Sequence, residues 1–358
     1  MPVLVKINFS TVMEDKEKKN VVSAGDNLTD YMETVIADLE KEGKFPAAHV
    51  YRSVLRSFTR FWNSSAPMRN DPTSMSNVLA PIRDVFTSER LKEYETWLTE
   101  CEYSPNTIST YMRTLQAVYN RWMPPGMVDY NPILFKELYT KVESRTKRAL
   151  TAEQMRQLET TDFNALSLPQ QRVLAYFLLM FMLRGMPFID LAHLRKQNLQ
   201  GRRIVYRRHK TGKLMVVDVP PDAFRLLQKY RNRAESEYLF PILNEASPGK
   251  ERYRLYQDTL RRFNRELARL MKKLLPGVSV SSYTARHTWA TLAYHSGTPL
   301  GLISQSLGHS SIRVTMSYLK PFDAEVIDKV NRQVIALVKG SKKKKVDSIN
   351  MLYGTLLR

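Results

Sequence analysis

The 358-residue sequence has little cysteine and histidine and no long apolar run, and each shortage excludes a class of protein. A single cysteine, Cys101, cannot form a disulfide within the chain, and six histidines beside it are too few for a typical structural zinc site. The longest apolar run, at residues 173–183, is too short to cross a bilayer. The opening residues MPVLVKINFS lack the layout of a signal peptide. We therefore expect a soluble protein of a reducing cell interior.

Acidic residues are scarce relative to basic ones. The chain has 55 Lys and Arg against 35 Asp and Glu, a formal net charge of +20. So many like charges repel one another in a compact protein and favour binding to a polyanionic partner. Nucleic acid is the first candidate and an anionic membrane the second. The length exceeds that of an ordinary single domain, so two domains are expected.

Apolar periodicity and breaker residues divide the chain into five parts. They are an N-terminal strand or arm at 1–25, a helical domain at 26–125, a linker at 126–149, a second domain at 150–340 and a basic tail at 341–358. In the second domain, RRIVYRRHKTGKLMVVDVP alternates like two strands around a Lys-Thr-Gly-Lys turn, between helical segments. The predicted fold class is mainly α with a small β-sheet.

Two helices of the first domain carry side chains suited to phosphate contact. In PAAHVYRSVLRSFTRFW the arginines recur every four residues and line one stripe. The segment SPNTISTYMRTLQAVYNRW begins with Ser104 as N-cap and Pro105 in the first turn, and it leaves small polar side chains beside an arginine. A solvated helix face is the alternative. The predicted DNA-binding residues are Arg52, Arg56, Arg60, Asn106, Thr107, Thr110 and Arg113, with Lys147 in the linker.

One tyrosine near the C-terminus lies where other groups could activate it. Tyr318 stands nine residues after His309, in a segment that reads as helix, tight turn, helix, with Gly308 ending the first helix. A phenol has a pKa of roughly 10, so attack on a phosphodiester needs cations at the phosphate oxygens and an acid for the leaving oxygen. Arginine forks suit the first role and a hairpin lysine suits the second. The candidates are Arg286, Arg184 and Lys210, with Lys213 as a rival on the same turn.

The segment TARHTWATLAYHSGTPLGLISQSLGHSSIRVTMSYLK resembles the C-terminal signature of the tyrosine recombinases, the phage integrase family. An Arg-His pair opens a helix, Leu-Gly-His follows, and a tyrosine stands nine residues on. With RGMPFIDLAHL and the helices of residues 52–122, the sequence looks most like integrases of Bacteroides-type mobile elements along nearly the whole chain. The resemblance implies a SAM-like domain that binds the core site and a catalytic domain, which together form a C-shaped clamp on DNA.

The resemblance also implies a role for each residue. Tyr318 would attack a DNA phosphate, giving a 3′-phosphotyrosyl link and a free 5′-hydroxyl that attacks the link of a partner duplex, without metal, ATP or another cofactor. Arg286 would hold the phosphate, and Lys210 would protonate the leaving oxygen. His309 would hydrogen-bond the phosphate or assist proton transfer. His287 and Asp190 are expected to support these groups without touching the DNA.

Two positions depart from the family pattern. The His-x-x-Arg motif begins here with Tyr283, a weak base at pH 7 that can still donate a hydrogen bond to a phosphate oxygen. Pro187 takes the place of the first catalytic arginine, three residues before Asp190. Arg184 stands about one helical turn earlier and is expected to reach the same phosphate, or alternatively to pair with Asp190.

The leading interpretation is a site-specific recombinase of the bacterial cytoplasm and nucleoid that integrates, excises or inverts DNA. It would be a monomer in solution and a homotetramer on two double-stranded sites, with an accessory DNA-bending protein left open. The amphipathic stretch 324–338 would pack on a neighbouring protomer or on its own domain. Residues 1–25 look short for an arm-site domain, and Lys342–Lys345 could add nonspecific affinity. A type IB topoisomerase-like nicking-closing enzyme and a DNA-binding protein with a degenerate site are the alternatives.

Overall fold

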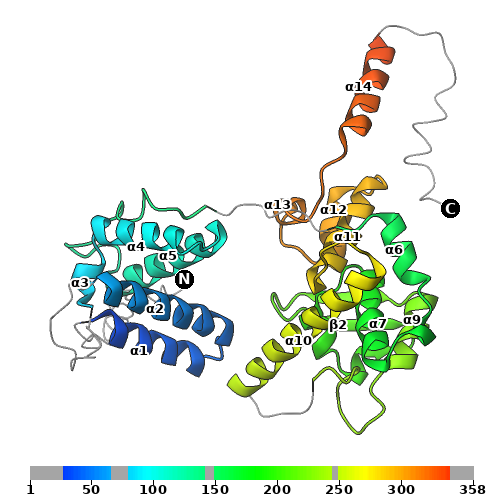
Figure 1. Ribbon diagram of the computed structural model, residues 1–358, viewed down its shortest axis with the longest axis horizontal. Helices are drawn as coiled ribbons and strands as arrows, with labels where there is room; N and C mark the ends of the chain where they lie inside the picture. Colours follow the sequence, from blue (N-terminus) through cyan, green and yellow to red (C-terminus); the bar gives the residue numbers. More distant parts are fainter. Residues whose placement is uncertain (1–26, 66–79, 142–148, 244–248, 339–358) are drawn as a thin grey trace, which may run out of the picture. The chain divides into compact units, whose positions relative to one another are not determined.

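The computed structural model describes residues 27–65, 80–141, 149–243 and 249–338 (Figure 1). The chain divides into two compact units, Met1–Glu143 and Ser144–Arg358, and the division falls inside the segment expected to be a linker. The expected arm at 1–25 and the basic tail at 341–358 lie outside the described residues. Within the described ranges, no helix combines the length and the apolar character needed to span a membrane.

The first unit is a bundle of helices. Its elements are α1 (Leu28–Lys41), α2 (Phe45–Ser65), α3 (Ile82–Val85), α4 (Ser88–Glu100) and α5 (Pro105–Trp122). At α1, α4 and α5 the side chains of Asn27, Thr87 and Ser104 accept a hydrogen bond from the backbone N–H three residues on. The predicted start of α5, with Ser104 as the cap and Pro105 in the first turn, is confirmed. The core of the bundle includes the fully buried rings of Phe58 and Tyr94, which meet edge to face.

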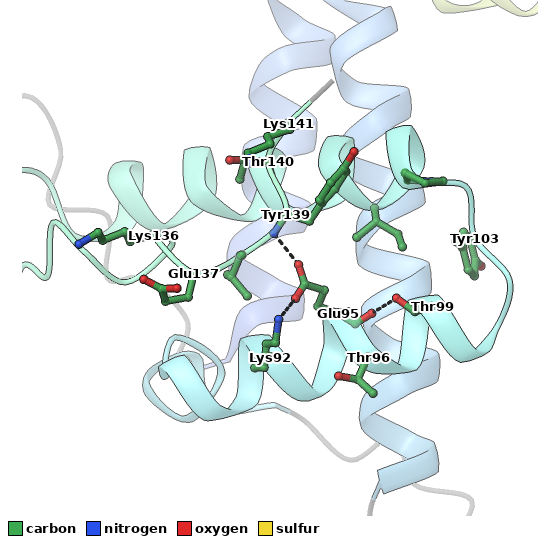
Figure 2. A pocket seen from close by; sticks show the side chains of 13 residues that line it. Lys92, Glu95, Thr96, Thr99, Tyr103, Lys136, Glu137, Tyr139, Thr140 and Lys141 are labelled. Carbon is green, nitrogen blue, oxygen red and sulfur yellow. Dashed lines mark hydrogen bonds and ion pairs between the residues drawn. The ribbon is translucent and has the colours of Figure 1, made fainter. Parts of the chain in front are cut away.

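Residues expected to begin the linker instead pack into the first unit. The buried apolar side chains of this segment are Leu134, Phe135 and Leu138. The backbone N–H of Tyr139 donates to the buried carboxylate of Glu95 on α4, which also pairs with Lys92 (Figure 2). These contacts border a pocket of about 710 Å³ and hold the chain against α4 up to Tyr139. The link to the second unit therefore begins later than the breaker residues suggested.

The second unit combines helices with a small antiparallel sheet of order β1-β2-β3. Its first half contains α6 (Ala152–Glu159), η2 (Phe163–Ala165), α7 (Leu168–Met182), α8 (Phe188–His193), η3 (Lys196–Asn198), β1 (Leu199–Gln200), β2 (Arg203–Arg207) and β3 (Leu214–Asp218). Its second half contains α9 (Pro221–Tyr230), α10 (Lys250–Leu274), α11 (Ser282–His295), α12 (Leu300–Leu307), α13 (Ile312–Met316) and α14 (Ala324–Val338). The predicted fold class, mainly α with a small sheet, is confirmed.

Helix α7 lies inside the second unit and contacts α9, α10 and α11. All its residues from 173 to 180 are buried, as expected of a helix that is apolar on every side. Its C-terminal turn ends in Arg184 and Gly185, which both have left-handed backbone conformations with φ of 59° and 64°. This turn approaches α11 so closely that a Cβ atom on Gly185 would lie 3.0 Å from the Cα atom of Arg286.

Strands β2 and β3 form the predicted hairpin. Arg207 pairs with Leu214 at its end, and Gly212 takes a left-handed conformation in the turn. Alternate side chains, including Ile204 and Tyr206 on β2, are buried, because successive residues of a strand point to opposite faces. The hairpin therefore places its turn, with two lysines, at the edge of the unit's core.

Helix α14 has no buried side chain. The predicted amphipathic pattern does form a helix, but its apolar residues stay exposed, from 42% for Ile335 to 84% for Val338. Packing on its own domain, one of the two expectations for this stretch, is therefore not what the described residues show.

Candidate active site

Tyr318 lies directly after α13 among three side chains of the predicted site. Its ring stacks on that of His309 and is tilted against that of His287, each with centroids 4.9 Å apart. The guanidinium carbon of Arg286 lies 5.3 Å from the centre of the ring. The backbone carbonyl of Tyr318 accepts a hydrogen bond from His287 Nδ1 at 3.0 Å. His287 therefore holds both the backbone and the ring of Tyr318 in place.

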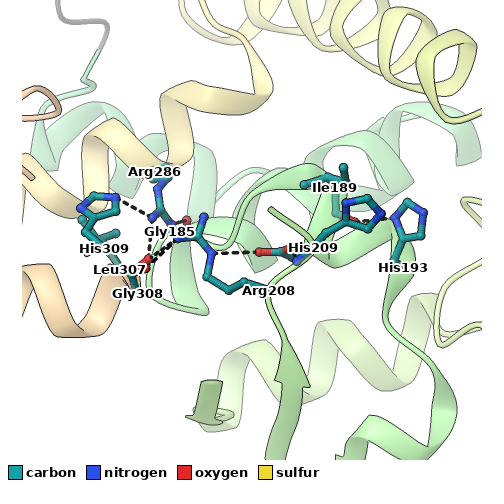
Figure 3. A network of polar contacts seen from close by, with 10 residues as sticks. Gly185, Ile189, His193, Arg208, His209, Arg286, Leu307, Gly308 and His309 are labelled. Carbon is teal, nitrogen blue, oxygen red and sulfur yellow. Dashed lines mark hydrogen bonds and ion pairs between the residues drawn. The ribbon is translucent and has the colours of Figure 1, made fainter. Parts of the chain in front are cut away.

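Arg286 is buried on α11, with only 2% of its surface exposed. Its Nη1 donates to the carbonyl of Gly185 at 2.8 Å, and its Nη2 donates to the carbonyl of Leu307 at 2.6 Å and to His309 Nε2 at 2.9 Å (Figure 3). Its Nε is buried without a hydrogen-bond partner. Burial, and then the charge of Arg208, lower the pKa of Arg286. A buried cation with an unused donor is a site that an anion would stabilise.

His309 follows the left-handed Gly308 that ends α12, as the sequence predicted. A guanidinium can only donate, so the contact with Arg286 makes His309 Nε2 an acceptor and places the proton on Nδ1. Nδ1 then donates to the buried hydroxyl of Thr315 at 2.9 Å. Burial, followed by the charges of Arg286 and Arg208, lowers the pKa of His309 to about 4. The imidazole is therefore neutral at pH 7, and the electron pair at Nε2 accepts the hydrogen bond from Arg286.

Arg208 is a member of this cluster that the sequence reasoning missed. It is 8% exposed, and its Nη1 donates to the carbonyls of Leu307 and Gly308, both at 3.0 Å (Figure 3). Its Nε lies 3.4 Å from Asp190 Oδ2 in a buried ion pair. A sequence signal for it exists. Ile204 and Tyr206 point inward from β2, and one more step of the same alternation leads to Arg208.

Asp190 on α8 is buried and joins the cluster to the hairpin. Besides the ion pair, its Oδ1 accepts a hydrogen bond from the backbone N–H of His209 at 2.8 Å. Burial raises the pKa of Asp190, and the hydrogen bond from His209 and the charge of Arg208 oppose that rise. The expected supporting position of Asp190 fits these contacts, but its arginine partner is Arg208 and not Arg184.

Arg184 points to a different place. Its Nη1 donates to the carbonyl of Val216 on β3 at 3.3 Å. In the part of the chain that the structure describes, no hydrogen bond or ion pair joins it to Arg286, His309 or Asp190. The sequence placed Arg184 in the site because it stands about one helical turn before Pro187, whereas residues 184 and 185 form a left-handed turn and do not continue a helix to residue 187.

The two hairpin lysines and Tyr283 stand at the exposed side of the cluster. Lys210 and Lys213 are exposed, and both charges lower the pKa of His309, with Lys213 the stronger of the two. The ring of Tyr283 stacks on Tyr318 with centroids 6.3 Å apart, and 48% of the residue is exposed. Desolvation of the hydroxyl, and then the neighbouring Tyr318, raise the pKa of Tyr283, so it remains a hydrogen-bond donor.

The arginine stripe predicted on α2 is only partly free. Arg52 is half-buried and forms an ion pair with Glu40 on α1, with 2.6 Å between Nη2 and Oε1. Arg56 and Arg60 are exposed. Arg56 and Arg60 are therefore better placed than Arg52 to contact a phosphate.

The polar residues predicted at the start of α5 are half-buried, and some of their polar groups form hydrogen bonds within the helix. The backbone N–H of Thr107 bonds the Ser104 cap, and the hydroxyl of Thr110 donates to the carbonyl of Asn106. Arg113 is exposed, with its Nε on the carbonyl of Ser109. Lys147, the last predicted DNA-binding residue, lies outside the described residues.

The cluster around Arg286 in the second unit has an excess of positive charge. Arg208 and Arg286 share the carbonyl of Leu307 as an acceptor, and Asp190 is the carboxylate that pairs with Arg208. The hairpin lysines add further charge beside them. An anion held there would relieve repulsion between two buried guanidinium groups. Within the described ranges, no group of three or more His, Cys, Asp or Glu side chains is placed to hold a metal ion.

Both units match known protein families. Residues 148–325 match the model of the phage integrase family, and residues 27–138 match that of the phage integrase SAM-like domain. A curated relative, the tyrosine recombinase XerC-like protein of Caldanaerobacter subterraneus subsp. tengcongensis, is 25% identical over 262 residues. That alignment spans 64% of this chain and 66% of the relative.

Solved structures share the fold. The XerH site-specific recombinase bound to palindromic difH substrate is 17% identical, with 85% of this chain and 83% of that chain covered and a TM-score of 0.58. The lambda integrase dimer bound to a COC′ core site is 15% identical, with 86% and 83% covered and a TM-score of 0.56. The Tn1549 transposon integrase in complex with a circular intermediate DNA is 16% identical, with 79% and 92% covered and a TM-score of 0.51.

Proposed function

Because the chain belongs to the phage integrase family, the tyrosine recombinases, we propose that it is a site-specific DNA recombinase with Tyr318 as its nucleophile. One observation carries the assignment of the nucleophile. The ring of Tyr318 lies against His309 and under the buried Arg286, the two groups that can accept a proton and hold an anion. Tyr283 is the other phenol at the same cluster, but nearly half of it is exposed.

In the proposed cleavage step, the phenolic oxygen of Tyr318 forms a bond to phosphorus while the bond to the 5′ oxygen breaks. The phenol loses one proton and the leaving oxygen gains one. Arg286 would neutralise the phosphate, since its Nε has no protein partner. His309 would assist the first proton transfer through its unprotonated Nε2, which becomes able to accept the phenolic proton when Arg286 Nη2 turns from it to the phosphate. Lys210 would supply the second proton, with Lys213 as its rival on the turn.

Strand exchange then runs the same chemistry in reverse. The 5′-hydroxyl of a partner duplex attacks the phosphotyrosyl bond, and Tyr318 regains its proton. Because each step exchanges one phosphate ester bond for another, the exchange needs no external energy source. Tyr283, which stays protonated, would donate a hydrogen bond to a phosphate oxygen or to Tyr318. Arg184, which contacts the sheet, stays a prediction from the sequence.

The partners proposed are two double-stranded DNA sites and further copies of the chain, located at the nucleoid of a bacterial cytoplasm. Exposed Arg56, Arg60 and Arg113 of the first unit suit contact with phosphates. A homotetramer on DNA would cover the apolar face of α14, whose residues include Val330 at 52% and Leu337 at 71% exposure. We propose a monomer in solution and leave an accessory bending protein open.

The nucleophile is tested by trapping the covalent intermediate on fragmented bacterial genomic DNA. The protein is denatured in detergent, and the DNA that remains attached is sequenced. Tyr318→Phe is expected to abolish adducts, while Tyr283→Phe, which removes the other phenol at the cluster, should reduce their yield and keep their ends at the same sequence. Adducts that persist in Tyr318→Phe and vanish in Tyr283→Phe would move the nucleophile to Tyr283.

The reaction type is tested with a supercoiled plasmid that carries two copies of the recovered sequence. Recombined circles, or an inverted segment between the two copies, are expected from the wild type. Relaxed circles alone would instead establish a nicking-closing enzyme. No adduct on any DNA, together with retention of DNA binding, would leave a binding protein with an inactive site.

A further inference from the structure

We propose that Arg208, rather than Arg184, supplies the second guanidinium that neutralises the scissile phosphate, and that Asp190 is the residue that positions it. The proposal rests on the proposed function and deepens it, because it names how the site replaces the arginine that the family pattern expects at Pro187. It assigns the role to a residue on another secondary-structure element, at the end of β2.

Arg208 lies beside Arg286 at the end of α12. Both guanidinium groups donate to the same carbonyl, that of Leu307, at 3.0 and 2.6 Å. Two cations on one acceptor lie beside each other, so a single phosphate can contact both. The charge of Arg208 is also the second cause, after burial, of the lowered pKa of Arg286, as expected of two neighbouring cations.

One nitrogen of the Arg208 guanidinium remains available as a donor. Its Nε is directed to Asp190 and its Nη1 to the carbonyls of Leu307 and Gly308. Among the hydrogen bonds of the described residues, none uses Nη2. Arg286 correspondingly keeps its Nε without a partner. Each arginine thus has a donor in reserve, as two groups that share one anion require.

The side chain of Arg208 is held firmly on two sides. The Asp190 carboxylate binds both its guanidinium and the backbone N–H of the next residue, His209. On the other side, a Cβ atom on Gly308 would lie 2.9 Å from Arg208 Cδ, so the side chain passes directly beneath the turn that carries His309. A catalytic cation must be fixed before the substrate arrives, and these contacts fix it.

Arg184 meets none of these conditions. Its guanidinium contacts the Val216 carbonyl on the outer strand of the sheet, and its backbone is left-handed. Asp190, the carboxylate that could have oriented Arg184, already forms its ion pair with Arg208. We therefore assign Arg184 to the junction between α7 and β3.

The chemistry makes the proposal testable by removing charge from the substrate. In the transition state the two non-bridging oxygens carry negative charge, and loss of one preorganised donor group costs about 10²- to 10³-fold in rate. A methylphosphonate replaces one of these oxygens with a neutral methyl group. A cation that neutralises the phosphate is then no longer needed, whereas a cation that only supports the fold is needed as before.

The experiment measures single-turnover adduct formation on two synthetic duplexes of the recovered sequence, one with a phosphate and one with a methylphosphonate at the scissile position. Arg208→Ala is expected to be about 10²- to 10³-fold slower than wild type on the phosphate. Its ratio of methylphosphonate to phosphate rate should rise at least tenfold above that of the wild type. Arg184→Ala should keep the wild-type ratio, whatever its rate.

The matched control is Arg203→Ala, which removes an exposed arginine of the same strand that pairs with Asp218 and should keep wild-type rates. Because each ratio is measured within one folded variant, reduced stability of Arg208→Ala cancels. Asp190→Asn keeps an acceptor for His209 but removes the charge, and it should show a smaller rise of the ratio. An unchanged ratio in Arg208→Ala, or a raised ratio in Arg184→Ala, would overturn the proposal. Absence of adducts from the wild type on the phosphate duplex would instead overturn the proposed function.

Discussion

Gly185 controls how closely the end of α7 approaches the helix that carries Arg286, and this can be measured with one methyl group. Gly185→Ala would place a Cβ atom 3.0 Å from Arg286 Cα, 3.2 Å from its Cγ and 3.4 Å from its Cβ. The nearest of these atoms is backbone, so α11 or the turn must shift. The chain also offers a matched control, because Gly201 has nearly the same φ, 61° against 64°, and open space where a Cβ atom would lie.

Both variants strain the backbone, but only Gly185→Ala also overpacks its surroundings. An alanine in the left-handed region costs about 1–2 kcal/mol, and this applies to both positions. Overpacking against a rigid neighbour adds about 1–3 kcal/mol, and this applies to Gly185 alone. We therefore expect a loss of about 1–2 kcal/mol in the free energy of unfolding for Gly201→Ala and about 2–5 kcal/mol for Gly185→Ala.

The effect on activity should separate the two variants further. The carbonyl of Gly185 accepts a hydrogen bond from Arg286 Nη1, so movement of the turn moves the guanidinium. A misplacement of about 1 Å at a catalytic group can cost about 10²-fold in rate, so a shift of part of that distance should cost about 10- to 100-fold. Adduct formation should fall by that factor in Gly185→Ala and stay at the wild-type level in Gly201→Ala.

The assay combines urea titration with hydrogen exchange read on peptides of the second unit, because a chain of two units need not unfold in one step. Single-turnover adduct formation supplies the activity. Equal destabilisation of the two variants, with adduct formation by Gly185→Ala at the wild-type rate, would show that the close approach does not position Arg286.

Two further predictions concern His309. Its pKa is about 4 in the folded chain against roughly 6.5 when unfolded, so the unfolded state binds more protons between these values and stability must fall as the pH drops through that window. The loss should reach about 1–3 kcal/mol at pH 4, allowing for partial solvent screening, and a His309→Gln variant measured in parallel should lose that much less. Thr315→Val removes the acceptor of His309 Nδ1, while Arg286 still donates to Nε2, so the proton should stay on Nδ1 without a partner. The ¹⁵N shift of Nδ1 should change, and adduct formation should slow about tenfold, the equivalent of one hydrogen bond. An unchanged Nδ1 shift would show that Nδ1 does not donate to Thr315.

Local chemistry made much of this fold predictable. The alternation in β2 and β3, the apolar run of α7, the Ser104 cap and the Gly308 stop each depend on residues close together in the sequence. The C-terminal signature likewise brought Tyr318, His309 and Arg286 together, because they lie on three consecutive helices or their ends.

Contacts between distant elements were beyond such reasoning. Helical periodicity placed Arg52 on a stripe with Arg56 and Arg60, but it could not show that Glu40 of α1 lies opposite Arg52. Breaker residues suggested a linker from residue 126, but Phe135 of that segment packs on Phe86 and Tyr119 of the bundle. In each case a partner far away in the sequence decided the outcome.

The arginine that the family pattern expects at Pro187 was also misplaced by sequence reasoning, because its replacement depends on contacts between distant elements. The family pattern expects an arginine three residues before Asp190. That position is Pro187, the N-cap residue of α8. In space, the site is defined by what receives the guanidinium, namely the Asp190 carboxylate and the carbonyls that end α12. Any strand or helix that delivers an arginine to those acceptors satisfies the same chemistry. Here β2 delivers it, because Arg208 continues the inward face of the strand by one step beyond Tyr206. In this chain those acceptors bind Arg208, so the phosphate site that we propose does not need an arginine at residue 187.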